Sequence, residues 1–129
     1  MVVDQTNQKP VTGKLVSFEP ADDGGSVESM CNTAYKGVEM RRNLHLAGGE
    51  LTDHFTCASD AEHTYDYVLI LRQPVNLGAD AEPIDFNGIH AYNRITNASK
   101  VTMNGPRTIK LEGVTLTLNA ENTPYELIQ

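Results

Sequence analysis

Apolar and polar residues alternate with a period of two along much of this chain, and this alternation constrains the fold more than any other feature. The apolar members of three such runs are Val38, Met40, Leu44 and Leu46; Leu51, Phe55 and Cys57; and Val114, Leu116 and Leu118. Successive side chains of a strand point to opposite faces, so each run predicts a strand with one buried and one wet face. The segment 65–71 is apolar on both faces and predicts a central strand.

Turn residues separate these runs at regular intervals. The turn signals are Gly24-Gly25, Gly48-Gly49, Asn104-Gly105 and Glu112-Gly113. Those at 48–49 and 112–113 lie between alternating runs and predict hairpins, whereas the stretch 73–83, with two prolines and a glycine, predicts a long loop. No long segment keeps the 3.6-residue period of a helix. We therefore expect an all-β fold, an antiparallel β-sandwich, as a single domain over residues 1–129.

Composition and charge exclude several functions. The formal net charge is −7, which argues against nucleic-acid binding, because phosphate recognition needs clustered cations. The chain contains no Trp, which weakens an aromatic sugar-binding platform. No apolar run approaches the roughly 20 residues of a membrane span, and the first ten residues lack a signal peptide, so we expect a soluble chain. Cys31 and Cys57 fall in predicted strands, which favours free buried thiols over a disulfide and leaves their redox state open.

One block carries a resemblance to a known family. Residues 34–71 read AYKGVEMRRNLHLAGGELTDHFTCASDAEHTYDYVLIL, with Tyr35, Gly37, Val38, Arg42, Asp53, His63, Tyr65 and Asp66 at characteristic spacings. This pattern resembles the β-sandwich domain of heparinase II/III-like and oligoalginate-lyase-like polysaccharide lyases. The opening VVDQTNQKPVTGKLVSFEP is similar to the strand that follows a His-Asn-Thr triplet in that family. The resemblance covers roughly residues 2–75, and the second half of the chain carries no signature.

The resemblance implies a bacterial, periplasmic or secreted parent in which an α-helical toroid precedes the sandwich. In that family a Tyr and a His of the toroid serve as acid and base, and a further His comes from the triplet. None of these lies within this chain, so we expect no catalytic residue and no lyase turnover from it. The first ligand of the family's structural zinc would lie at or before Met1, so we expect neither a metal nor another cofactor.

The basic strand offers candidate binding residues. Arg41 and Arg42 are adjacent and therefore point to opposite faces. A hairpin turning at Gly48-Gly49 places Arg42 opposite Phe55 and diagonal to Asp53 on the apolar face. We therefore predict an Arg42–Asp53 ion pair, because a buried charge needs a partner. Arg41 then becomes the candidate for a uronate carboxylate, which the guanidinium fork matches.

Tyr35 borders the same strand, and it is either a sugar contact, as the family implies, or a packed Tyr at the sandwich edge. We expect Tyr65 and Tyr67 to be core residues of the central strand. The four histidines are His45, His54, His63 and His90, and their spacing lacks a zinc motif, although His45 and His54 could form a two-ligand surface site. Ser59, Asp60 and His63 show no nucleophile elbow, which argues against hydrolase chemistry.

The sequence thus predicts a non-catalytic sandwich module that supports the parent's cleft and contacts acidic polysaccharide. Its partners would be that polysaccharide or the α-helical catalytic domain. Two alternatives stay open: a free-standing carbohydrate-binding module and a structural or assembly β-sandwich protein. The few aromatic residues count against the first alternative, and the family pattern counts against the second.

Overall fold

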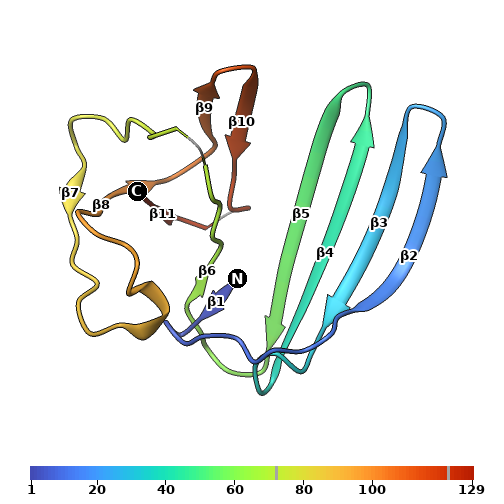
Figure 1. Cartoon of the computed structure of the whole chain (residues 1–129), viewed down its shortest axis with the longest axis horizontal. Helices are drawn as coiled ribbons and strands as arrows, with labels where there is room; N and C mark the ends of the chain where they lie inside the picture. Colours follow the sequence, from blue (N-terminus) through green and yellow to red (C-terminus); the bar gives the residue numbers. More distant parts are fainter. Residues whose placement is uncertain (72, 122) are drawn as a thin grey trace. The chain divides into compact units, whose positions relative to one another are not determined.

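The computed structural model describes residues 1–71, 73–121 and 123–129 (Figure 1). The strands are β1 (Val2–Val3), β2 (Lys14–Ala21), β3 (Gly24–Cys31), β4 (Val38–Ala47), β5 (Glu50–Ser59), β6 (Tyr65–Asp66), β7 (Glu82–Pro83), β8 (Ser99–Met103), β9 (Arg107–Leu111), β10 (Val114–Leu118) and β11 (Tyr125–Ile128). The only helical element among these residues is the short 3-10 helix η1 (His90–Tyr92). All strand pairs are antiparallel, so the predicted all-β class is confirmed.

The chain divides into two compact units, Met1–Val68 and Leu69–Gln129. The sandwich arrangement and the single domain over residues 1–129 therefore stay predictions. In the part of the chain that the structure describes, no helix is long and apolar enough to cross a membrane.

The first unit is built on a four-stranded sheet in the order β2-β3-β4-β5. The predicted hairpin between β4 and β5 is confirmed, with Arg42 opposite Phe55 and Leu44 opposite Asp53. Gly48 and Gly49 connect the strands with φ of 55° and 79°. Two successive residues with positive φ are the requirement of a type I′ turn, which is why glycine occupies both positions.

The core of this unit lies against one end of the apolar face of the sheet. Its buried residues are Val3, Ala34, Tyr35, Val38 and Met40, and Met1, Cys31, Phe55 and Cys57 pack against them. The two-stranded sheet of β1 and β6 contributes Val3, whose partner across the ladder is Tyr65. The same face is open towards the β4–β5 hairpin, where Leu51 is 61% exposed and Phe18, on β2, is 66% exposed.

The two cysteines cannot form a disulfide with each other in this sheet. Both Cys31 on β3 and Cys57 on β5 are register partners of Met40 on β4, one on each side. Neighbouring strands lie about 4.8 Å apart, so the two Cα atoms are separated by roughly 9–10 Å, which is beyond the reach of a disulfide. Both thiols are free, and they are half-buried rather than buried as predicted.

The predicted central strand over 65–71 is wrong. Only Tyr65 and Asp66 form a strand, and residues 67–71 have no strand partner among the described residues. Tyr65 is 37% exposed, Tyr67 is 42% exposed and Ile70 is 95% exposed, so neither tyrosine is the core residue that we expected. An apolar run is a signal for burial, but it cannot specify a hydrogen-bonding partner.

The second unit contains the hairpin β9–β10 and a three-stranded sheet in the order β11-β8-β7. The hairpin predicted at Glu112-Gly113 is confirmed, with Leu111 opposite Val114. The hydroxyl of Tyr125 lies 3.1 Å from the carbonyl oxygen of Gly105 and 3.2 Å from that of Leu118. This side chain therefore ties β11 to the turn before β9 and to the end of β10.

Candidate functional site around the N-terminal segment

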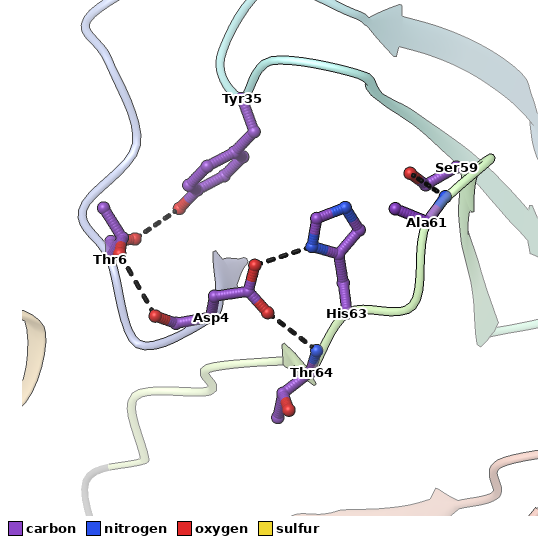
Figure 2. A network of polar contacts seen from close by, with 7 residues as sticks. All are labelled: Asp4, Thr6, Tyr35, Ser59, Ala61, His63 and Thr64. Atoms are coloured by element: carbon purple, nitrogen blue, oxygen red, sulfur yellow. Dashed lines mark hydrogen bonds and ion pairs between the residues drawn. The ribbon is translucent and has the colours of Figure 1, made fainter.

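Several residues of the segment 34–71 converge on the N-terminal segment, residues 1–6, although they are far from it in the sequence (Figure 2). Val2 pairs with Asp66, and Val3 pairs with Tyr65. His63 contacts Asp4, and its ring meets the ring of Tyr65 edge-on at 6.0 Å between centroids. Four strands separate residues 1–6 from this part of the chain, so only the tertiary fold assembles the cluster.

Asp4 is the centre of the cluster. Its Oδ2 lies 2.6 Å from His63 Nδ1, and its Oδ1 accepts a hydrogen bond of 2.9 Å from the backbone N–H of Thr64. Its own N–H donates to the carbonyl oxygen of Thr64 at 2.9 Å. The Thr64 bond first, and then His63, hold the pKa of the Asp4 carboxyl below its ordinary value.

The backbone is left-handed at this point, with φ of 49° at Asp4 and 55° at Gln5. Such a conformation is uncommon for residues other than glycine, and Asp tolerates it better than most. It turns the chain so that the carboxylate of Asp4 faces Thr64 and His63. We interpret the hydrogen bonds of Asp4 as what holds this turn, because a local strain persists only where surrounding contacts impose it.

Tyr35 fastens the other side of the same segment. Its hydroxyl donates to the carbonyl oxygen of Thr6 at 2.9 Å and lies 3.3 Å from that of Met1. The residue is only 9% exposed, and burial raises the pKa of its phenol. Of the two interpretations of Tyr35, the structure places it as a packed core residue, so its ring is not open to stack on a sugar. Gly37, with φ of 77°, makes the turn that leads from Tyr35 into β4.

A second polar network lies on the apolar face of the large sheet. Arg42 donates to Asp53 through Nε at 2.9 Å and through Nη2 at 2.6 Å, so the predicted ion pair is present and bidentate. The hydroxyl of Tyr67 donates to Asp53 Oδ2 at 2.6 Å and accepts from Arg42 Nη2 at 3.1 Å. The ring of Tyr67 packs edge-on against Phe55. The Arg42 bonds hold the pKa of Asp53 below its ordinary value.

This pair is less buried than the apolar pattern predicts. The side chain of Arg42 is 44% exposed, and that of Asp53 is 24% exposed. Burial of the sheet face is confined to the end at Val38 and Met40, and the alternation of residues could not show where the covering layer stops.

Arg41, on the opposite face, already has carboxylate partners. Its Nη1 lies 3.0 Å from Glu28, and its Nε lies 2.8 Å from Glu39. The side chain is 43% exposed, so it is accessible, but a uronate would have to compete with both carboxylates.

The cluster around Asp4 ties residues 1–6 to the segment that follows β5. Asp4 orients the His63 ring through Nδ1, and the hydroxyl of Ser59 accepts a hydrogen bond from the N–H of Ala61. Within the described ranges, no three His, Cys, Asp or Glu residues come together as metal ligands. Sequence reasoning missed Asp4, Thr6 and Thr64, and only the opening Val-Val-Asp pointed towards the first of them. It assigned Tyr67 to the core and did not predict its bonds to Arg42 and Asp53.

Compared with known proteins, the chain matches no family model, no curated sequence and no solved structure.

Proposed function

We propose that this chain is a non-catalytic β-module of a polysaccharide-lyase-like protein, in which it supports the substrate cleft. The proposal rests on the contacts that the residues of the family pattern make in the structure. Tyr35, His63, Tyr65 and Asp66 all contact or pair with the N-terminal segment. Residues that share one structural task in this way are expected to recur together at fixed spacings, which accounts for the resemblance without requiring catalysis.

The chemistry of β-elimination supports the same conclusion. The reaction removes a proton next to a carboxylate, so it needs a positioned base, an acid and a cation near the substrate. In this chain the phenol of Tyr35 is buried against two carbonyl oxygens, and His63 is held by Asp4. Arg42 is locked onto Asp53. The phenol of Tyr35 and the guanidinium of Arg42 are therefore engaged within the chain, and Asp4 fixes the orientation of His63.

Any contact with an acidic glycan would fall to Arg41 in this proposal. Its guanidinium is exposed, and it lies on the polar face of the sheet. Because Glu28 and Glu39 already neutralise it, the contact would be weak and would weaken further with salt.

The decisive test of the non-catalytic role is an assay for unsaturated uronate. The purified chain is incubated with alginate, heparin and heparan sulfate, and the ultraviolet absorbance of the elimination product is followed. We expect no product above the rate without protein. Sustained turnover that is abolished by His63→Ala or Tyr35→Phe, in variants that keep the wild-type thermal melt, would overturn the proposal.

Glycan contact is tested separately by titrating alginate and heparin oligosaccharides into the chain and following amide chemical shifts. We expect small shifts confined to the surroundings of Arg41, which disappear in Arg41→Ala. Lys14→Ala, on the same face of β2, is the matched control that removes a cation without touching Glu28 or Glu39. If Arg41→Ala and Lys14→Ala reduce the chemical-shift changes equally, the glycan is attracted non-specifically, and the glycan contact is removed from the proposal.

A structural or assembly role is the second candidate, and one observation favours it. The apolar face of the large sheet leaves several large side chains exposed, among them Leu15, Phe18 and Leu51. The reading frame of the source gene separates the two candidates. An α-helical toroid encoded upstream in the same frame supports the lyase module, and a frame without one supports assembly.

A further inference from the structure

Strand β5 is a long sheet edge without the usual protection. It runs for ten residues, Glu50–Ser59, and within the described part of the chain it pairs with β4 alone. It contains no proline, glycine or lysine, and its register with β4 shows no bulge. Such an edge presents a row of backbone donors and acceptors that can pair with another extended strand.

The opposite edge of the same sheet is protected in two ways. The register of β2 with β3 shifts between Leu15 and Ser17, which marks a bulge, and Pro20 lies within the strand. A bulge twists an edge away from a partner, and proline removes a donor. The contrast between the two edges makes β5 the side on which the sheet can grow.

The geometry of the hairpin determines which backbone groups of β5 face outwards. Across a two-residue type I′ turn the flanking residues, here Ala47 and Glu50, form a hydrogen-bonded pair. Hydrogen bonding alternates along an antiparallel ladder, so the N–H and C=O groups of residues 51, 53, 55 and 57 point away from β4. Among the residues that the structure describes, no other segment bonds to these groups.

Charge does not block this edge. An acidic side chain within a strand usually protects an edge, and Asp53 stands near the middle of β5. Here Arg42 and Tyr67 both bond to its carboxylate from within the same unit. The charge is thereby paired before any partner strand arrives.

We propose that a second copy of this chain pairs with β5 through its own β5, antiparallel about a two-fold axis at Phe55. In this register every odd-numbered residue faces an odd-numbered residue and every even-numbered residue faces an even-numbered one. Because side-chain direction alternates along a strand, the apolar faces of both sheets then lie on the same side. Thr52 faces Ala58 of the second copy, Asp53 faces Cys57, and Phe55 faces its own equivalent, so no like charges oppose each other within residues 51–59. Beyond this range Glu50 faces Asp60 at each end, and salt screens the repulsion of these exposed carboxylates.

A second copy fits better than an unrelated strand because residues 51–59 of β5 match themselves in charge and in apolar face. The wider chain carries a net charge of −7, so two copies repel at a distance. Moderate salt should therefore strengthen the association, since it screens that repulsion and leaves backbone hydrogen bonds intact. The inference does not depend on the proposed function.

The test compares two substitutions at one position. Leu51→Pro removes an outward N–H, whereas Leu51→Ala removes the same apolar side chain and keeps the N–H. Sedimentation equilibrium at two salt concentrations gives the dimer dissociation constant of each protein. We expect dimers for the wild type and for Leu51→Ala, and at least a tenfold weaker dimer for Leu51→Pro, because each copy loses a bond across the interface.

Amide exchange by nuclear magnetic resonance gives a second measurement that does not rely on a variant. Protection of residues 51, 53, 55 and 57 should rise with protein concentration, while the even residues, already bonded to β4, should change little. A monomer at all concentrations would overturn the proposal. So would equal loss of the dimer in Leu51→Ala and Leu51→Pro, because contact would then run through side chains of the face.

Discussion

At the scale of single residues, the energetics of the Arg42–Asp53 pair depend on how much water reaches it. Its geometry is bidentate and Tyr67 completes the network, but Arg42 is almost half exposed. Solvent screens an accessible pair, so the 3–5 kcal/mol typical of a broken buried pair does not apply here. The network is better regarded as a local clamp between β4, β5 and the segment after β6.

We expect Arg42→Ala and Asp53→Ala each to lower the free energy of unfolding by about 1–2 kcal/mol, above an ordinary exposed pair because of the bidentate geometry and Tyr67. The double variant should lose clearly less than the sum of the two, since both remove the same interaction. Denaturant melts give these values. Arg41→Ala, on the wet face, is the control and should change stability by about 0.5 kcal/mol or less. Strictly additive losses in the free energy of unfolding would show that Arg42 and Asp53 do not stabilise the fold through a shared interaction.

Asp4 gives the stability of the chain a specific acid dependence. The pKa of its carboxyl is lowered in the folded state, so its charge stabilises the fold above the ordinary carboxyl pKa near 4. That contribution disappears as pH falls through the lowered value. Asp53, whose pKa is lowered mainly by Arg42, acts in the same direction.

The change Asp4→Asn should therefore lower the melting temperature at pH 7 and bring it close to the wild-type value in strong acid. Asn keeps the shape of the side chain and tolerates positive φ, so the loss reports the charge. Thermal melts from pH 7 to pH 2 measure it. Asp23→Asn, in the exposed β2–β3 turn, is the control. An equal deficit of Asp4→Asn at every pH would show that the charge of Asp4 does not stabilise the fold.

At the scale of elements, the close approach of β3 and β4 depends on glycine. A Cβ at Gly24 would lie 1.9 Å from the carbonyl oxygen of Leu46, which is backbone and cannot move without shifting the strand. This requirement explains why the β2–β3 turn carries a glycine that its φ alone does not demand. The sequence marks the position as a turn, and only the neighbouring strand reveals the steric reason.

We expect Gly24→Ala to lower the free energy of unfolding by about 1–3 kcal/mol, the usual range for a forced overlap that the backbone must relieve. Gly105→Ala is the matched control, because nothing lies within 4 Å of its Cβ position and its φ is not positive. It should change stability by about 0.5 kcal/mol or less. Chemical denaturation of both variants measures the difference, and similar losses would mean that the overlap is relieved without cost.

At the scale of the whole molecule, the chain is two compact units joined near residues 68–69. The joining segment has apolar side chains but no strand partner among the described residues, and Ile70 is 95% exposed. Exposed backbone without ladder bonds is the preferred substrate of proteases.

Limited digestion with thermolysin, which cuts before large aliphatic residues, should therefore cleave first around residues 69–71 and release two fragments that match the two units. Mass spectrometry of early time points identifies the cut. The β4–β5 turn is the internal comparison, because it is exposed but bounded by two fully paired strands. First cleavage at that turn, or at scattered sites, would contradict this view of the joining segment.

The sequence by itself determined the all-β class, the β4–β5 hairpin with its register, and the pairing of Arg42 with Asp53. These features depend on local rules: the period of two, the glycines of a type I′ turn, and the need of a charge on an apolar face for a partner. The tertiary structure alone decided that Tyr35, Asp4 and His63 meet around residues 1–6, and that residues 67–71 lie outside any strand. The contact between Asp4 and His63 joins residues 59 positions apart, and such contacts depend on which strands pair and where the covering layer ends. Alternation along one strand says which face is buried, and it carries no information about the segment that does the burying.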